Sequence, residues 1–152
     1  GIVVESNTPY IHPIGIQPKR DGTIRLCVDA SSFNGIVVPE HHDPPRIEGF
    51  LFEESHGGIF SSFEYKNGFL QIPLDEETSH FLGIQVNGKT YESRRLPFGT
   101  KVSGSVFMRI ARKVALEGVD ERHVKMYVDD IKVQTTDFET HLNILEQMLS
   151  NI

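Results

Sequence analysis

The chain has 152 residues, a length typical of one domain or two closely packed subdomains. Hydrophobic residues make up 38% of it and charged residues 24%, a balance that excludes a disordered or fibrous protein. With 15 Lys and Arg against 21 Asp and Glu, the net charge is −6. Domains that grip nucleic acid usually carry a basic field, so this charge argues against a generic nucleic-acid binder.

Cysteine content and apolar runs bear on the cellular compartment. A single cysteine, Cys27, excludes an internal disulfide and fits a reducing environment. No apolar run reaches the roughly 18–20 residues of a membrane span, and the first residues lack a signal-peptide pattern. We therefore expect a cytoplasmic or nuclear location. Because the chain begins with Gly and ends soon after an amphipathic stretch, we also expect it to be part of a longer polypeptide.

The hydrophobic pattern predicts short strands followed by two helices. Alternation of apolar and polar residues predicts strands, and apolar residues every three or four positions predict helices. In chain order, the pattern comprises a hairpin over residues 15–28, a turn-rich polar connection over 39–45, short apolar runs over 59–63 and 70–74, a hairpin over 81–96, a helix over 104–117, a hairpin over 123–133 and a final helix after Asp137. This order predicts an α+β fold with helices packed on one face of an antiparallel sheet.

Several residues mark where these elements turn, begin or end. Asn87-Gly88 supplies the positive φ angles of a two-residue type I′ turn and is the clearest hairpin signal. Ser103 or Ser105 is the expected N-cap of the first helix, and Gly118 is expected to end it.

Two adjacent carboxylates are expected at the tip of the hairpin over residues 123–133, in the sequence Tyr127-Val128-Asp129-Asp130. Asp is common in turns because its side chain bonds nearby backbone amides, and that interpretation stays open. The alternative is a Mg²⁺ site for phosphoryl transfer, which needs carboxylates from neighbouring strands. Glu64, at the end of the apolar run over 59–63, is the candidate partner.

Seven short blocks in order carry a resemblance to a known family. They are Lys19-Arg20-Asp21-Gly22-Thr23-Ile24-Arg25-Leu26-Cys27-Val28-Asp29, Pro45-Arg46-Ile47, Phe60-Ser61, Asn67-Gly68-Phe69-Leu70-Gln71-Ile72-Pro73, Leu96-Pro97-Phe98-Gly99, Phe107-Met108 and Tyr127-Val128-Asp129-Asp130. Together they resemble the reverse transcriptase of gypsy-type LTR retrotransposons, over almost the whole chain. A single Tyr-X-Asp-Asp is a weak signal, but the ordered set is specific.

The resemblance implies the fingers and palm of a right-hand polymerase without thumb or RNase H. Fingers would comprise residues 1–40 and 72–98, and palm residues 41–71 and 99–152. The family's metal-binding Asp corresponds to Asp129 and its neighbour to Asp130, so Mg²⁺ is the implied cofactor. The positions that match the family's nucleotide-binding residues are Lys19 and Arg25 (triphosphate), Phe69 (exclusion of a ribose 2′-hydroxyl) and Phe98.

The residue patterns alone also permit ordinary roles for these positions. Lys19 is also explained as a solvated residue beside a hairpin turn, and Phe69 and Phe98 as core aromatics. His41-His42-Asp43 suggests zinc, but without cysteine partners or a helical His pair we interpret it as a solvated loop.

Departures from the family pattern gather around the implied active centre. Glu64 stands where the family has its first catalytic Asp, and the extra methylene moves the carboxylate by more than about 1 Å, a misplacement that can cost 10²-fold in rate. Residues 30–33 lack the family's aromatic and Arg, and residues 100–104 lack its Asn and Pro. The core-forming blocks are kept, so the pattern favours a retrotransposon-derived domain retained for its shape.

The final helix offers an interaction surface. Its apolar stripe is explained either by core packing or by a protein interface, because a palm without a thumb exposes surface. The stripe consists of Phe138, Leu142, Leu145 and Leu149.

Two functions follow from these observations. The first is a catalytically impaired domain that acts as a protein-interaction module, with a protein partner and only weak contact with nucleic acid. The second is the fingers-palm fragment of an active RNA-directed DNA polymerase that uses two Mg²⁺ ions.

Overall fold

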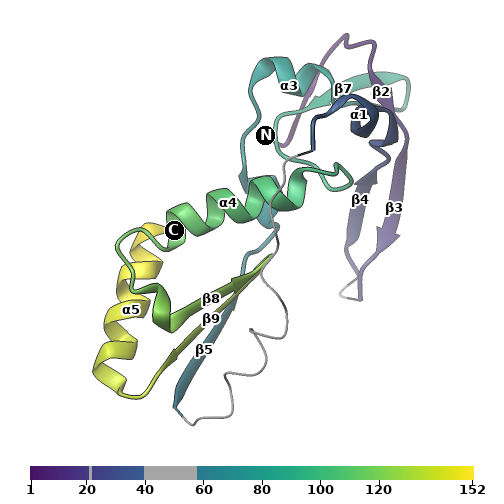
Figure 1. Cartoon of the computed structure of the whole chain (residues 1–152). Helices are drawn as coiled ribbons and strands as arrows, with labels where there is room; N and C mark the ends of the chain where they lie inside the picture. Colours follow the sequence, from purple (N-terminus) through teal and green to yellow (C-terminus); the bar gives the residue numbers. More distant parts are fainter. Residues whose placement is uncertain (21, 40–57) are drawn as a thin grey trace. The chain divides into compact units, whose positions relative to one another are not determined.

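The computed structural model describes residues 1–20, 22–39 and 58–152, and the chain divides into two compact units (Figure 1). Unit 1 comprises Gly1–Glu40 and Asn67–Gly104, and unit 2 comprises His41–Lys66 and Ser105–Ile152. The assignment of fingers and palm to these units stays a prediction. The His41-His42-Asp43 set, the Pro45-Arg46-Ile47 block and most of the predicted polar connection lie outside the described residues.

Unit 1 contains a four-stranded sheet in the order β1-β7-β6-β2. Its strands are β1 (Val3–Glu5), β2 (Ile11–His12), β6 (Gly83–Val86) and β7 (Lys89–Ser93). The predicted β6–β7 hairpin is confirmed, and Asn87 and Gly88 at its turn have φ angles of 50° and 77°. The short β2 pairs with β6 in parallel, so this sheet is mixed and not purely antiparallel as predicted.

A separate two-stranded sheet in unit 1 confirms the predicted first hairpin. It pairs β3 (Ile14–Pro18) with β4 (Ile24–Val28) in antiparallel fashion. Three short helical segments complete the unit: α1 (Ser31–Ile36), η2 (Gly68–Gln71) and α3 (Glu76–His80). Part of the apolar run over 70–74 therefore belongs to a 3-10 turn, and Pro73 forms an isolated bridge with Arg95.

Unit 2 is built on a three-stranded antiparallel sheet in the order β5-β9-β8. Its elements are β5 (Ile59–Glu64), η3 (Glu121–His123), β8 (Val124–Tyr127), β9 (Asp130–Thr135) and α5 (Phe138–Asn151), together with α4 (Ser103–Ala115) from Ser105 onward. Side chains along the strands alternate between buried and more exposed, as expected for a sheet that is covered on one face. The predicted α+β order and the helices on one face of this sheet are confirmed (Figure 1).

The core of unit 2 lies between this sheet and its helices. The most deeply buried apolar residues include Phe107, Ala111, Ala115, Val124, Met126, Ile131, Val133, Ile144 and Met148. A fully buried side chain of this size contributes about 1.5–3 kcal/mol relative to an exposed one. Burial of this set therefore fixes the sheet against α4 and α5.

The helix ends agree with the sequence at one helix and differ at the other. Asp137 is the N-cap of α5 as predicted, and its carboxylate accepts a hydrogen bond from the Thr140 amide at 2.8 Å. Ser103 is instead the first residue inside α4, where its buried hydroxyl donates to the carbonyl of Pro97 at 2.7 Å. Gly118, with a φ of 71°, reverses the chain a few residues beyond the end of α4.

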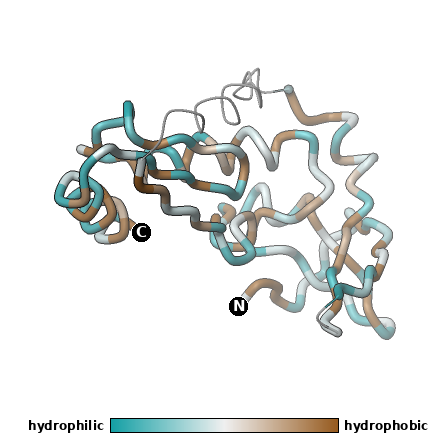
Figure 2. The backbone as a smooth tube through the Cα atoms, turned by 90° about the horizontal axis from the view of Figure 1, so that it is seen from below, coloured by the Kyte–Doolittle hydropathy of each residue, from teal (hydrophilic) through white to brown (hydrophobic). Residues whose placement is uncertain are grey.

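The face of helix α5 that packs on the core is not the predicted apolar stripe. Its buried residues are His141, Ile144 and Met148. Three residues of the predicted stripe are largely exposed, with exposed fractions of 64% for Phe138, 48% for Leu142 and 52% for Leu149. The interpretation of this stripe as core is therefore wrong for these three residues, whereas Leu145 is half-buried. In Figure 2 the helix that ends at the C-terminus carries hydrophobic residues among hydrophilic ones on successive turns.

Candidate functional site

The two aspartates of Tyr127-Val128-Asp129-Asp130 lie where strands β8 and β9 meet. Tyr127 pairs with Asp130, so Val128 and Asp129 form a two-residue turn. Val128 has a φ of 52°, an unusual angle for a β-branched residue that costs on the order of 1–3 kcal/mol. Only the first turn position has a positive φ, as in a type II′ turn. The turn therefore stores backbone strain beside the two carboxylates.

Glu64 is brought to this turn by strand register. It is the last residue of β5 and lies directly opposite Asp130 on β9. Partners in an antiparallel pair point to the same face, and both residues are exposed. Two like charges in this position destabilise a sheet by up to about 1 kcal/mol. Strand register therefore brings Glu64 next to Asp130. Packing alone does not explain why both residues are acidic, because the two carboxylates repel each other.

The turn is held from behind by the residue after Glu64. The backbone amide of Tyr65 donates to the carbonyl of Asp129 with an N···O distance of 2.9 Å. The Tyr65 ring packs edge-to-face on buried Phe107 of α4, with ring centroids 5.4 Å apart, and burial raises the pKa of its hydroxyl. One carboxylate oxygen of Asp129 is buried. These contacts fix the turn to the core of unit 2.

The carboxylates fit Mg²⁺ in chemistry but do not form a complete site. Glu64, Asp129 and Asp130 would supply the hard oxygen donors that Mg²⁺ prefers. Within residues 1–20, 22–39 and 58–152, no group of three or more His, Cys, Asp or Glu side chains is arranged to hold a metal ion. The assignment of Glu64 and Asp129 as metal ligands therefore stays a prediction.

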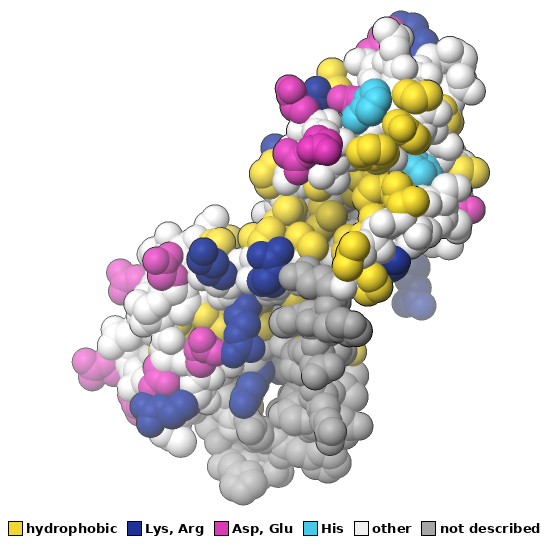
Figure 3. All heavy atoms as spheres, turned by 45° about the horizontal axis from the view of Figure 1, so that its top comes forward, with side chains coloured by type: hydrophobic (Ala, Val, Ile, Leu, Met, Phe, Trp, Pro, Cys, Tyr) yellow, Lys and Arg dark blue, Asp and Glu magenta, His cyan; other side chains and the backbone are white. Residues whose placement is uncertain are grey.

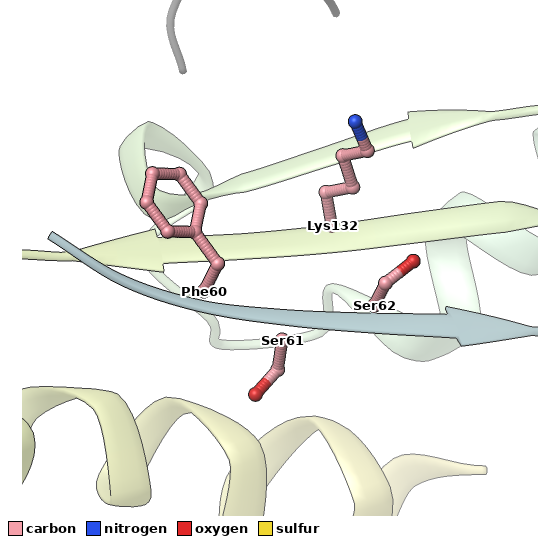
Figure 4. A pocket seen from close by; sticks show the side chains of 4 residues that line it. All are labelled: Phe60, Ser61, Ser62 and Lys132. Carbon is pink, nitrogen blue, oxygen red and sulfur yellow. The ribbon is translucent and has the colours of Figure 1, made fainter. Parts of the chain in front are cut away.

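A cavity lies on the sheet of unit 2 close to Glu64 and Asp130. It has a volume of about 390 Å³ and is lined by Phe60, Ser61, Ser62 and Lys132 from β5 and β9. Figure 4 shows Phe60, Ser62 and Lys132 on the sheet face away from α5, whereas Ser61 points toward α5. Register places Ser62 opposite Lys132, one pair along from Glu64 and Asp130. Among the described residues, this face of the sheet thus combines an aromatic ring, a hydroxyl and an ammonium group.

Three of the four predicted nucleotide-binding residues form one cluster in unit 1. The Arg25 guanidinium lies 5.5 Å from the centroid of the Phe98 ring, within the range of a cation–π contact. Phe69, in η2, packs on Phe98 with ring centroids 5.0 Å apart. Lys19 lies at the turn end of the β3–β4 hairpin, where its amide donates to the carbonyl of Thr23 at 2.7 Å. Both phenylalanines are half-buried, so a packing role and a nucleotide-binding role both stay predictions.

The loop that carries Phe98 is shaped by Gly99. Its φ is 103°, and a Cβ at this position would lie 2.2 Å from the carbonyl oxygen of Val28. Only glycine combines this backbone angle with so close an approach. Gly99 therefore positions Phe98 near Arg25 of the neighbouring strand.

Asn34 is a positioning residue that sequence reasoning missed. Its side-chain amide donates to the carbonyl of Gly99 at 3.0 Å and its carbonyl accepts from the Lys101 amide at 2.7 Å. These bonds tie α1 to the loop before α4, where the family's Asn and Pro are missing. The available signal was the place of Asn34 five residues after the Cys27-Val28-Asp29 end of the first family block. In the same block, hydrogen bonds from the Ser31 hydroxyl and amide hold the pKa of Asp29 below its ordinary value.

Two further findings concern the charged side chains on unit 2 and the length and apolar character of the helices. In the view of Figure 3, Lys and Arg side chains gather in a band along unit 2, and most of the Asp and Glu side chains lie to one side of this band. In the part of the chain that the structure describes, no helix is long and apolar enough to cross a membrane.

Comparisons with known proteins show which family the chain belongs to. A family profile described as reverse transcriptase (RNA-dependent DNA polymerase) matches residues 17–152. The retrovirus-related Pol polyprotein from the Drosophila melanogaster transposon opus is 31% identical over 100% of the chain, and that from transposon gypsy is 28% identical over 98% of it. The chain spans only 16% and 15% of these two polyproteins.

Solved structures give the same result for the fold. A foamy viral protease-reverse transcriptase in complex with double-stranded DNA matches 99% of the chain with a TM-score of 0.89 and 25% identity, and the match covers 26% of that protein. The native prototype foamy virus enzyme matches 99% of the chain with a TM-score of 0.85 and 24% identity, over 20% of its own length. The fold is therefore that of these reverse transcriptases. Since the family profile covers most of the chain and the relatives are transposon polyproteins, the chain is a retrotransposon-type domain that belongs to the reverse transcriptase (RNA-dependent DNA polymerase) family.

Proposed function

We propose that this domain carries the catalytic carboxylates of an RNA-directed DNA polymerase in a form that transfers nucleotides slowly, and that it also acts through protein contacts. The observation that carries the first part is the placement of Glu64 directly opposite Asp130 beside the strained Val128-Asp129 turn. Two-metal phosphoryl transfer needs carboxylates that lie close together, and this register supports the proposal because it brings Glu64 beside the turn that carries Asp129.

In this proposal, Glu64 and Asp129 bind Mg²⁺ and Asp130 adds negative charge beside them. Bound Mg²⁺ would activate the primer 3′-hydroxyl and stabilise the leaving pyrophosphate. Tyr65 would keep the turn in place through its hydrogen bond to the Asp129 carbonyl. The longer Glu64 side chain moves its carboxylate by more than about 1 Å from where an Asp would hold it, which supports impaired turnover.

Unit 1 would bind the incoming nucleotide. Arg25 and Lys19 would hold the triphosphate, as basic side chains do in phosphoryl transfer. Stacking of Arg25 on Phe98 limits the rotamers of the guanidinium and so reduces the ordering cost of binding. Phe69, packed on the other phenylalanine, would form the side of the site near the ribose. The foamy viral enzyme bound to double-stranded DNA supports a primer–template as the nucleic-acid substrate.

Primer extension tests the catalytic proposal. The natural polypeptide that contains this domain would be given a primed RNA template, dNTPs and Mg²⁺ or Mn²⁺, and compared with Glu64→Asp and Asp129→Asn variants. We expect slow extension by the natural protein, an increase of up to about 100-fold in Glu64→Asp and none in Asp129→Asn. Equal rates for the natural protein and Glu64→Asp would refute impairment, and no extension by any of the three would refute the polymerase.

The protein-contact role is favoured by a separate observation. Phe138, Leu142 and Leu149 are about half exposed or more on α5, although their residue types are those normally found in cores. Apolar side chains that recur along one helix are a common docking surface. A Leu142→Lys variant of the natural polypeptide should lose a bound protein partner without losing its fold.

A further inference from the structure

The exposed apolar residues of α5 follow a 4-3-4 spacing. Phe138, Leu142, Leu145 and Leu149 are separated by four, three and four positions, which is the spacing of the contact positions between paired helices. Leu145 is half-buried, and the other three have exposed fractions of 48–64%. We call these four residues the α5 seam. With 3.6 residues per turn, the seam lies about a quarter-turn around the helix from the buried face.

Hydrogen bonds inside unit 2 fix the rotation of α5 and so hold the seam outward. His141, 2% exposed, bonds through Nε2 to the Ser61 hydroxyl of β5 at 2.9 Å and through Nδ1 to the Thr135 hydroxyl of β9 at 3.0 Å. The Thr135 hydroxyl donates to the Asp137 carbonyl, so it accepts from Nδ1–H, and Ser61 then donates to Nε2. The side chains of His141, Ser61 and Thr135 are all hydrogen-bonded only in this orientation of the helix.

The far end of the helix is anchored as well. The side-chain amide of Asn151 donates to the carbonyls of Ala115 and Glu117, at 3.3 and 2.9 Å. Both ends of α5 are therefore tied to unit 2, and the helix cannot rotate to bury the seam without breaking these bonds. The seam is a fixed surface of the domain.

The border of the seam is acidic. Glu139 and Glu146 are exposed and follow Phe138 and Leu145 by one position each, which places both carboxylates on the side of the seam away from the core. Asp137 adds a third carboxylate at the helix N-terminus, and residues 138–151 contain no Lys or Arg. A partner that covers the seam meets negative charge along one border.

This charge decides between the possible occupants. A second copy of α5 packed antiparallel would bring the Glu139 and Glu146 borders of the two helices together, and like charges repel there. Helices that lie on a membrane surface carry Lys and Arg beside their apolar face, and α5 carries neither. A helix with basic residues beside its apolar face satisfies both the seam and its border.

We propose that the α5 seam is a docking site for an amphipathic helix of another protein, with an apolar stripe bordered by Lys or Arg. This inference rests on the protein-contact role proposed above and adds the chemistry of the partner. Its apolar residues would cover the four seam residues, and its basic residues would pair with Glu139 and Glu146.

Two designed peptides test the proposal. Both are helical with leucines at 4-3 spacing, and they differ only in carrying Lys or Glu at the border positions. Fluorescence anisotropy of each labelled peptide would be followed as the natural polypeptide is added. We expect the Lys peptide to bind at least about tenfold more tightly than the Glu peptide, with an affinity that falls as salt is raised.

Variants locate the binding. Leu142→Lys should weaken binding of the Lys peptide at least about tenfold. Val114→Lys is the matched control, since Val114 is a 41% exposed apolar residue on neighbouring α4. Glu139→Lys with Glu146→Lys should reverse the preference toward the Glu peptide, and circular dichroism would verify that each variant is folded.

The remaining outcomes overturn the proposal in distinguishable ways. Equal binding of both peptides, lost in Leu142→Lys, would refute the basic partner but keep a protein-contact role. A dimer in sedimentation equilibrium that Leu142→Lys dissociates would identify a second copy as the occupant. Binding of neither peptide would refute helix docking at the seam, whereas the polymerase proposal depends only on primer extension.

Discussion

Replacement of His141 tests how α5 is held on its sheet. His141→Ala removes a side chain that is 2% exposed, together with its bonds to Ser61 and Thr135. Each bond contributes about 1 kcal/mol, the Ser61 hydroxyl that loses its acceptor adds about 1 kcal/mol, and the cavity adds a similar amount. We expect the free energy of unfolding to fall by about 3–4 kcal/mol, measured by urea denaturation with linear extrapolation.

A double-mutant cycle separates the hydrogen bond from the cavity. Ser61→Ala in the His141→Ala background removes the stranded hydroxyl, so the double variant should be more stable than the sum of the single losses by about 1–2 kcal/mol. Leu142→Ala, on the exposed seam, is the control and should cost less than about 1 kcal/mol. Additivity within about 0.3 kcal/mol would refute the Ser61–His141 bond as described.

Three further predictions concern a loop, a helix cap and the carboxylate pair. Gly99→Ala should lower the free energy of unfolding by at least about 2 kcal/mol in urea denaturation, because a Cβ would lie 2.2 Å from the Val28 carbonyl oxygen at a φ of 103°; an unchanged midpoint would contradict this loop geometry. The hydrogen bond from the α5 backbone lowers the pKa of Asp137, so its stabilisation is present above the unfolded-state pKa of about 3.9 and is lost as pH falls through the lower folded-state value. Thermal melts below pH 4 should therefore depend less on pH in Asp137→Asn, a cap that does not titrate, and equal pH dependence would refute the cap. Glu64→Gln should stabilise the domain by up to about 1 kcal/mol by removing the like charge opposite Asp130, and it should abolish any rise in melting temperature on adding Mg²⁺; the same rise in both proteins would exclude Glu64 as a ligand.

Elements governed by local sequence could be predicted closely. Asn87-Gly88 specifies its own turn, and the structure has the expected positive φ at both residues. Asp137 accepts from the backbone three residues later, as its N-cap position implies. Such signals need no distant partner, so a single sequence carries them.

Elements that depend on distant partners could not be predicted. Strand β2 is only two residues long and exists because it pairs with β6, about seventy positions later. The buried face of α5 was also misjudged, because its sequence offers two apolar stripes and only the sheet decides which one is covered. His141 joined the buried face because Ser61 and Thr135 provide hydrogen-bond partners on β5 and β9.

In the candidate site, too, some features could be predicted from the sequence and others depend on contacts between distant residues. The position of Glu64 after the apolar run over 59–63 and the family blocks led to Glu64 as the carboxylate that joins the Asp129-Asp130 pair, and strand register places it opposite Asp130. The stacking of Arg25 on Phe98 joins residues more than seventy positions apart, and the pattern alone gave no sign that the two are in contact. The role of Asn34 likewise arises from a loop that approaches α1 only in the folded chain.

The hydrogen bond from Tyr65 to the Asp129 carbonyl has a practical consequence. A backbone amide exchanges with deuterium only when its hydrogen bond opens, so the Tyr65 amide is a single-residue reporter on the carboxylate turn. A cation that rigidifies Asp129 would slow exchange at this amide in the absence of any primer, template or nucleotide. Ligand occupancy of the turn could therefore be measured by NMR independently of turnover.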